Sequence, residues 1–133
     1  NNGQEMLDTF KWVLNMHMLN SGDAAILSPE QVIRMACCNS AYAFGQPSEI
    51  GSLEPGKKAD VIIVDLGDPR MTMPSLSVPS LLVNFAKSSD VAMTIVDGKI
   101  LMQDKEILVV DEDQVLKEFR AARSALLIRA GVS

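Results

Sequence analysis

Three features of this sequence combine residue types and spacings that support chemistry in other proteins: a glycine-lysine loop, one histidine and two cysteines. The loop Gly51-x-x-x-x-Gly56-Lys57 matches most of a nucleotide-binding P-loop. However, Lys58 stands where such a loop has the Ser or Thr that holds magnesium. The apolar run that follows predicts a strand, whereas a P-loop opens a helix whose N–H groups meet the phosphate. The sequence therefore disfavours nucleotide binding and favours a Pro-Gly turn with solvated lysines.

The histidine and the cysteines do not form a convincing metal site. His17 is the only histidine, and a catalytic zinc usually takes three protein ligands. Cys37 and Cys38 lack the spacing to chelate a metal with it, and neighbours on a helix point about 100° apart. We expect two reduced thiols, at least one of them buried. Reduced thiols fit a cytoplasmic location.

The remaining polar candidates predict turns rather than catalysis. Asp60 and Asp65 border the expected strand, and Asp97 lies in an expected hairpin turn. Nothing places a base beside a particular serine, so no activated nucleophile is predicted. We therefore assign no catalytic, cofactor-binding or metal-binding residue to this chain.

Composition narrows the class of protein. The chain has 133 residues, with 47% hydrophobic and 22% charged residues, which favours one folded domain. A net charge of -5 disfavours a nucleic-acid partner. No apolar run approaches the roughly 20 residues that span a bilayer, and no signal peptide opens the chain. Because the first residue is Asn1 and not Met, we expect a processed, truncated or excerpted chain.

Two helices are predicted in the first third of the chain. The first spans Gln4 to Leu19, with an apolar face at three- and four-residue spacing. That face comprises Met6, Phe10, Val13, Leu14 and His17. Ser28-Pro29-Glu30-Gln31 predicts a second helix start with a capping box. This helix is expected to reach Phe44 and to end at a left-handed Gly45.

The chain then changes to strands. Ala59 to Leu66 hardly alternates in polarity, which predicts a strand covered on both faces. After a proline-rich connector, Ser80 to Ala86 suits one or two helical turns. Val91 to Val96 and Lys99 to Met102 predict a hairpin around Asp97-Gly98. These strands are too few to close a sheet, so we infer that a partner surface is missing.

The end of the chain predicts a short strand and a helix. Ile107 to Val110 is apolar enough for a short final strand. Asp111 is the expected cap of a last helix that ends near Gly131, with Gln114 completing the capping pattern.

Several segments, in this order, resemble the metal-dependent amidohydrolases. Gly51 to Asp65 is similar to their glycine-serine-leucine-glutamate-x-glycine-lysine-x-alanine-aspartate signature. Asp90 to Lys99 resembles their hairpin, which begins with aspartate-valine and ends with valine-x-glycine-lysine. Asn1 to Phe10, Met35 to Gly45 and Leu82 to Ala86 resemble other segments of the family. Within the family, the resemblance is to the branch of chlorohydrolases and of cytosine, guanine and S-adenosylhomocysteine deaminases.

The resemblance implies an α+β fragment of a larger fold. Residues 1–48 would be the last helices of a (β/α)8 barrel. Residues 49–133 would be the C-terminal part of a small composite β-sandwich with a closing helix. The parent enzyme would use zinc or iron to activate water against a C–N or C–Cl bond of a nitrogen heterocycle.

Departures from the family pattern bear on activity. The family's His-x-His pair is absent, His17 matches no ligand, and the metal-binding aspartate is expected upstream of Asn1. Cys38 and Ser40 stand where the family has threonine and glycine. We therefore predict no metal and no activity for this chain alone.

Two kinds of partner follow from the resemblance and from the missing surface. One is the missing N-terminal barrel portion, and the other is a second copy bound through the apolar strands. The alternatives to an enzyme fragment are a non-catalytic, oligomerising binding or assembly module and one half of a split enzyme.

Overall fold

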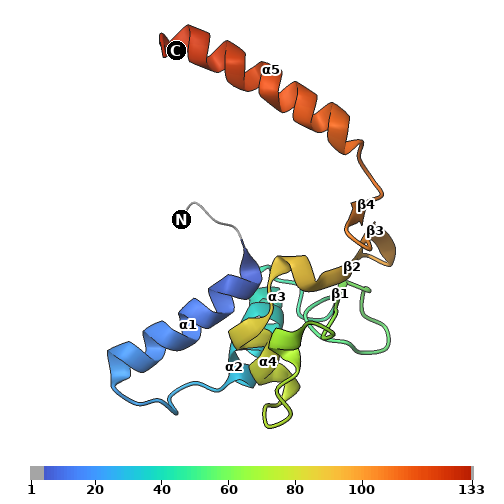
Figure 1. Ribbon diagram of the computed structural model, residues 1–133. Helices are drawn as coiled ribbons and strands as arrows, with labels where there is room; N and C mark the ends of the chain where they lie inside the picture. The colour runs from blue at the N-terminus through green and yellow to red at the C-terminus, as the bar shows by residue number, and fades with distance from the viewer. Residues whose placement is uncertain (1–4, 133) are drawn as a thin grey trace.

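The computed structural model describes residues 5–132 and shows an α+β chain (Figure 1). Its helices are α1 (Met6–Ser21), α2 (Pro29–Arg34), α3 (Ser40–Ala43), α4 (Val78–Phe85) and α5 (Glu112–Ala130). Its strands are β1 (Val61–Val64), β2 (Val91–Val96), β3 (Lys99–Gln103) and β4 (Glu106–Ile107). Helices α1 to α4 lie together, the strands continue from them, and α5 lies apart from the rest (Figure 1). Gln4 and the Asn1-Asn2-Gly3 segment lie outside the described residues.

The buried core lies where α4 packs against α1 and α2. One cluster comprises Leu7, Met71, Leu81 and Ala86, and a second comprises Leu14, Val32 and Val83. Full burial of one such aliphatic side chain contributes about 1.5–3 kcal/mol. Both clusters combine side chains from the two halves of the chain, so neither half has a core of its own among the described residues.

The buried face of α1 differs from the predicted one. Leu7 and Leu14 are buried and Phe10 packs beside them, whereas Met6 is 59% exposed and His17 is exposed. The prediction is confirmed for Phe10, Val13 and Leu14, which pack in the core, and is wrong for Met6 and His17 at the two ends of the predicted face. Leu7 and Leu14 are seven residues apart, nearly two full turns, so they lie on the same face toward α4.

The second predicted helix is confirmed in extent but is not uniform. The amide of Gln31 donates to Ser28 Oγ at 3.3 Å, and the amide of Ser28 donates to Gln31 Oε1 at 2.7 Å, which confirms the capping box. Gly45, with φ of 72°, follows the end of the helix as predicted. Between α2 and α3, however, Met35–Asn39 forms a π-helical turn that the sequence did not predict.

The loop after α3 fits closely against this π-helical turn. Gly51 has φ of 94°, and a Cβ atom built there would lie 2.6 Å from the Cβ of Ala41 and 3.0 Å from the Cys37 carbonyl oxygen. The thiol of Cys38 donates to the Gly51 carbonyl at 3.2 Å. Glycine is required here because both the backbone conformation and the close approach exclude a side chain.

The four strands form an antiparallel sheet in the order β1-β2-β3-β4. Asp97 and Gly98 both have positive φ, 50° and 76°, as the predicted hairpin turn requires. The strand predicted over 59–66 is confirmed only for Val61–Val64, and β4 ends at Ile107 rather than continuing to Val110. No residue of these strands is buried, so this chain does not itself provide the predicted cover on both faces of β1.

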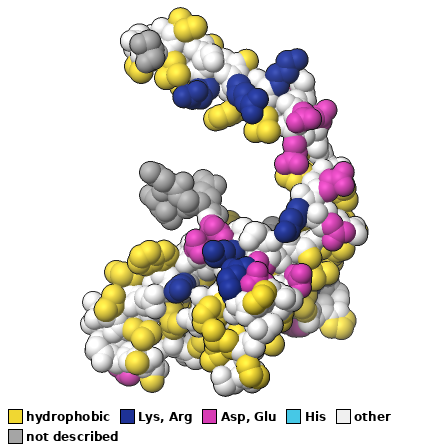
Figure 2. Space-filling model, in the orientation of Figure 1, with side chains coloured by type: hydrophobic (Ala, Val, Ile, Leu, Met, Phe, Trp, Pro, Cys, Tyr) yellow, Lys and Arg dark blue, Asp and Glu magenta, His cyan; other side chains and the backbone are white. Residues whose placement is uncertain are grey.

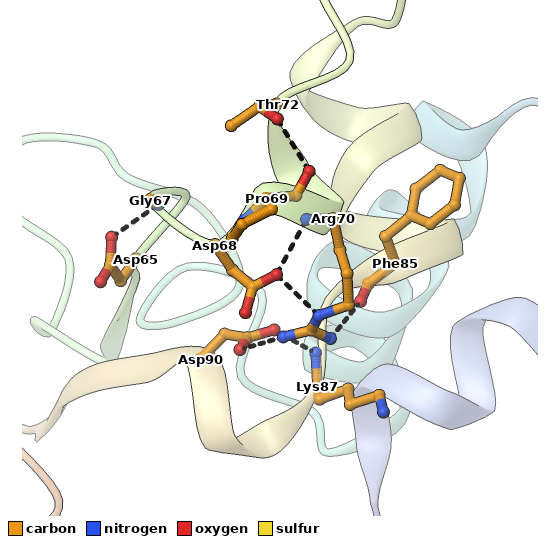
Figure 3. Close-up of polar contacts among 9 residues, drawn as sticks. All are labelled: Asp65, Gly67, Asp68, Pro69, Arg70, Thr72, Phe85, Lys87 and Asp90. Carbon is orange, nitrogen blue, oxygen red and sulfur yellow. Dashed lines mark hydrogen bonds and ion pairs between the residues drawn. The ribbon is translucent and has the colours of Figure 1, made fainter.

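An arginine joins the end of α4 to the start of the sheet (Figure 3). The Arg70 guanidinium donates to Asp68 Oδ1 at 2.8 Å, to the Phe85 carbonyl at 3.3 Å and to Asp90 Oδ1 at 2.9 Å. The other Asp90 carboxylate oxygen accepts the amide of Lys87 at 2.9 Å. The hydrogen bonds of Arg70 lower the pKa of Asp68. A single side chain thus fixes β2 relative to α4.

Helix α5 is the most isolated element. Asp111 Oδ1 accepts the amide of Gln114 at 3.0 Å, which confirms the predicted cap. The Gln114 side chain instead donates to Glu118, so the predicted reciprocal half of the capping pattern is wrong. Gly131, with φ of 66°, ends the helix as predicted. No residue of α5 is buried. Among residues 5–132, neither this helix nor another has the length and apolarity needed to cross a bilayer.

The fit of the loop against the π-helical turn is testable by comparing two glycines. Gly56 has φ of 93° but open space around it, so Gly56→Ala should cost only about 1 kcal/mol of backbone strain. Gly51→Ala meets Ala41 as well, and should cost about 1–3 kcal/mol more because the contact is too close. Urea unfolding of both variants, followed by circular dichroism, measures the difference. Equal stabilities would contradict the close packing at Gly51.

The Arg70 contacts predict a pH-dependent contribution to stability. Since Arg70 lowers the folded-state pKa of Asp68, its contribution is present above the ordinary aspartate pKa of about 4 and is lost as pH falls through the folded-state value. Arg70→Met should therefore lower the thermal midpoint at pH 7, and the deficit should shrink in acid. Arg70→Lys should fall between, because lysine lacks the planar fork. Lys99→Met, on exposed β3, is the control, and a deficit independent of pH would contradict this account.

Candidate functional site

The structure does not bring the sequence's chemical candidates together. Within residues 5–132, no group of three or more His, Cys, Asp or Glu side chains is placed to hold a metal ion. His17 lies exposed on α1, on a different element from Cys37 and Cys38 in the π-helical turn. The described side chains therefore do not fit the zinc or iron that the resemblance implies for the parent enzyme.

The aspartates have the turn roles that the sequence predicted. Asp60 Oδ1 accepts the amide of Asp97 at 2.7 Å, and this bond links the entry to β1 with the β2–β3 turn. Asp65 Oδ1 accepts the amide of Gly67 at 2.8 Å, which closes the turn after β1. Both carboxylates are thus used to hold backbone amides.

The lysines of the glycine loop behave differently from each other. Lys58 is 44% exposed and pairs with Glu49 at 2.7 Å. Lys57 is only 17% exposed, and its Nζ donates to the Pro47 carbonyl at 2.9 Å and to Ser52 Oγ at 2.6 Å. The prediction that both lysines are solvated is therefore wrong for Lys57.

Lys57 holds the loop in its folded shape. The sequence feature that could have predicted this role is the closeness of polar residues around the Pro-Gly turn. Ser52, Glu54 and Lys57 lie within six residues around the Pro-Gly turn. The Ser52 hydroxyl, followed by the charge of Lys57, lowers the pKa of Glu54. The loop leads into β1 and not into a helix, so its N–H groups do not form a phosphate site of the P-loop kind.

The two cysteines are free, as predicted, but neither is fully buried. Cys37 is exposed and Cys38 is half-buried, so the expectation that at least one thiol is buried is wrong. Desolvation of its thiol, together with the neighbouring Cys38, raises the pKa of Cys37. Because the thiolate is the reactive form, a raised pKa makes Cys37 a poor nucleophile.

One hollow with an almost wholly apolar lining is a groove between the helices and β1. Its volume is about 300 Å³. It is lined by Leu7, Phe10, Ile33, Cys37, Ile62, Val64, Leu66, Val78 and Leu82. Apart from the Cys37 thiol, this lining offers van der Waals contact and no acid or base for catalysis. Ile62 and Ile63, on β1, remain 50% and 48% exposed.

A larger, acidic hollow of about 580 Å³ lies near the Arg70 contacts of Figure 3. Asp65, Asp68, Asp90 and Asp104 contribute to its lining. The carboxylates of Asp65 and Asp90 accept hydrogen bonds from backbone amides, and that of Asp68 accepts one from Arg70. The carboxylates of Asp65, Asp68 and Asp90 therefore serve the turns and the junction between α4 and the sheet.

Sequence comparison finds relatives that are deaminases. The chain is 43% identical over 130 residues to the 5'-deoxyadenosine deaminase of Methanosarcina acetivorans. The aligned stretch covers 98% of this chain and 29% of the relative. It is 37% identical over 127 residues to the 5-methylthioadenosine/S-adenosylhomocysteine deaminase of Syntrophomonas wolfei. That alignment covers 96% of this chain and 29% of that relative. The chain thus spans less than a third of the length of these curated relatives.

Solved structures agree in fold. A zinc-bound adenosine deaminase from Xanthomonas campestris superposes with a TM-score of 0.85 and 27% identity, over 90% of this chain and 27% of that chain. Atrazine chlorohydrolase from Arthrobacter aurescens, complexed with zinc, gives a TM-score of 0.77 at 21% identity, over 86% of this chain and 25% of its own. The second likeness concerns the fold alone.

A family model assigns the chain directly. The model of the amidohydrolase family matches residues 1–101, about three quarters of the chain, and includes the loop and hairpin segments that carried the resemblance. The match, the deaminase relatives and the superposed zinc enzymes all agree. This chain belongs to the amidohydrolase family.

Proposed function

We propose that this chain is the C-terminal part of a deaminase-like amidohydrolase that hydrolyses a C–N or C–Cl bond of a nitrogen heterocycle. The observation that carries the proposal is the 43% identity to a 5'-deoxyadenosine deaminase across 98% of this chain. An adenosine-like nucleoside is accordingly the first substrate class to test. The two free thiols fit an enzyme of the reducing cytoplasm.

The proposal divides the chain between two parts of the parent fold. Residues 1–48 supply the last helices of the barrel, and residues 49–133 supply the C-terminal strands of the composite sandwich with its closing helix. The half-exposed β1 supports this division, because a strand of consecutive aliphatic residues is typical of a sheet with both faces covered.

The proposal places the metal ligands outside this chain. The described residues offer no ligand set for zinc or iron, and both superposed enzymes hold zinc in chains about four times the matched length. When bound in the parent, the metal would activate water. The residues described here act by supporting the fold around that site, so the chain alone is proposed to be inactive.

A non-catalytic assembly module is the second candidate, and a specific observation favours it. Large apolar side chains remain exposed on α1, β1 and α5, including Trp12 at 67% and Phe119 at 64%. Exposed apolar surface of this extent marks an interaction site. In a split enzyme the same surface would contact a separate polypeptide that carries the metal.

A chimera tests the catalytic proposal. We would replace the matched 29% of the Methanosarcina acetivorans deaminase with this chain, and assay zinc content and deamination of 5'-deoxyadenosine. We expect the chimera to bind zinc and to deaminate its substrate, and the 133-residue chain alone to do neither.

Native mass spectrometry of the 133-residue chain measures whether it binds a metal or forms oligomers, and can contradict the proposal. Stoichiometric zinc or iron on this chain, or deamination by it, would contradict the proposal. A chimera that folds and binds zinc but leaves 5'-deoxyadenosine and other adenosine-like nucleosides intact would remove the proposed substrate class. Stable, metal-free oligomers combined with an inactive chimera would favour the assembly module.

A further inference from the structure

Helix α5 has an apolar stripe that meets nothing in this chain. Val115, Phe119, Ala122 and Leu126 recur at spacings of four, three and four, which places them on one face of the helix. Phe119 is 64% exposed and Leu126 is 62% exposed. Side chains of this size favour burial by about 1.5–3 kcal/mol each, so the stripe is suited to a partner surface.

Charges beside the stripe indicate what that surface must offer. From residue 120 onward, α5 carries Arg120, Arg123 and Arg129 and no acidic residue, although the chain as a whole has a net charge of -5. Figure 2 shows hydrophobic and basic side chains together along α5, with acidic side chains near its start. A complementary surface is apolar along the helix and bears carboxylates beside the helix's C-terminal half.

Part of α5 has a counterpart in a larger enzyme. Residues outside the 19 of α5 number 114 of 133, which is less than the 90% of the chain that superposes on the Xanthomonas campestris adenosine deaminase. The superposition therefore includes part of α5. Only 27% of that enzyme is matched, so most of its chain remains to contact a helix in this position.

We propose that α5 is a docking helix, which binds this segment to the preceding part of the amidohydrolase fold through the Val115–Leu126 stripe. The inference rests on the proposed function, since it requires the chain to be part of a larger enzyme. The partner is an apolar surface with carboxylates beside it. At 3.6 residues per turn, Arg123 and Arg129 flank the stripe on opposite sides, so we expect carboxylates on both sides of that apolar surface. The exposed Leu108, Val109 and Val110 lie between the sheet and α5, which stands apart from the rest of the chain (Figure 1).

The chimera described above tests the docking helix through stability, without an assay of activity. Phe119→Asp/Leu126→Asp should lower its thermal midpoint by at least about 5 °C, because two apolar anchors are replaced by charges. Ala121→Asp/Ser124→Asp is the matched control, with the same added charge on the opposite face of α5. The control should melt close to the parent chimera.

The 133-residue chain gives the second measurement. There, Phe119→Asp/Leu126→Asp should leave the thermal midpoint unchanged, and the amides of α5 should exchange with deuterium quickly, whereas in the chimera they should be protected. Rapid α5 exchange in the chimera, equal melting of the two double variants, or a chimera that does not fold would overturn the proposal. Dimers of the 133-residue chain that Phe119→Asp dissociates would assign α5 to a second copy instead. An inactive chimera with a protected α5 would contradict the proposed activity and leave the docking helix standing.

Discussion

The packing of α4 against α1 and α2 is the contact on which the rest of the structure depends. Leu81 and Val83 of α4 reach both buried clusters, one with Leu7 and one with Leu14 and Val32. These partners lie about 50 to 75 residues earlier in the chain. Without this long-range contact, the first helices and the sheet would share no core. Arg70 then joins the end of α4 to Asp90, the residue just before β2.

The sequence predicted those elements whose causes are local. The capping box at Ser28, the left-handed glycine after α3 and the Asp97-Gly98 turn each depend on a few adjacent residues, and all three are confirmed. The π-helical turn was missed because its fit depends on Gly51, which arrives from a later loop. The centre of the buried face of α1 was predicted, but Met6 was chosen instead of Leu7, because the deciding neighbour, α4, lies more than 50 residues away.

The candidate site was predictable mainly through a family resemblance. The loop and hairpin signatures led to the amidohydrolases, and the family match includes both segments. What the sequence did not reveal was how those signatures work physically. Lys57 was expected in solvent, yet it bonds the Pro47 carbonyl and Ser52 and so sets the shape of the loop before β1. That role depends on the turn that brings the Pro47 carbonyl oxygen, ten residues earlier, within hydrogen-bond distance of the Lys57 amine.

The unburied sheet and α5 have a consequence for the heat capacity of the molecule. Unfolding raises the heat capacity mainly by exposing apolar surface, by about 12–15 cal/mol/K per residue in ordinary domains. The strands and α5 already expose much of theirs, including Ile62 and Leu126. The 133-residue chain should therefore have a flatter curve of stability against temperature than its length implies, and the curve should steepen once the exposed surfaces are covered.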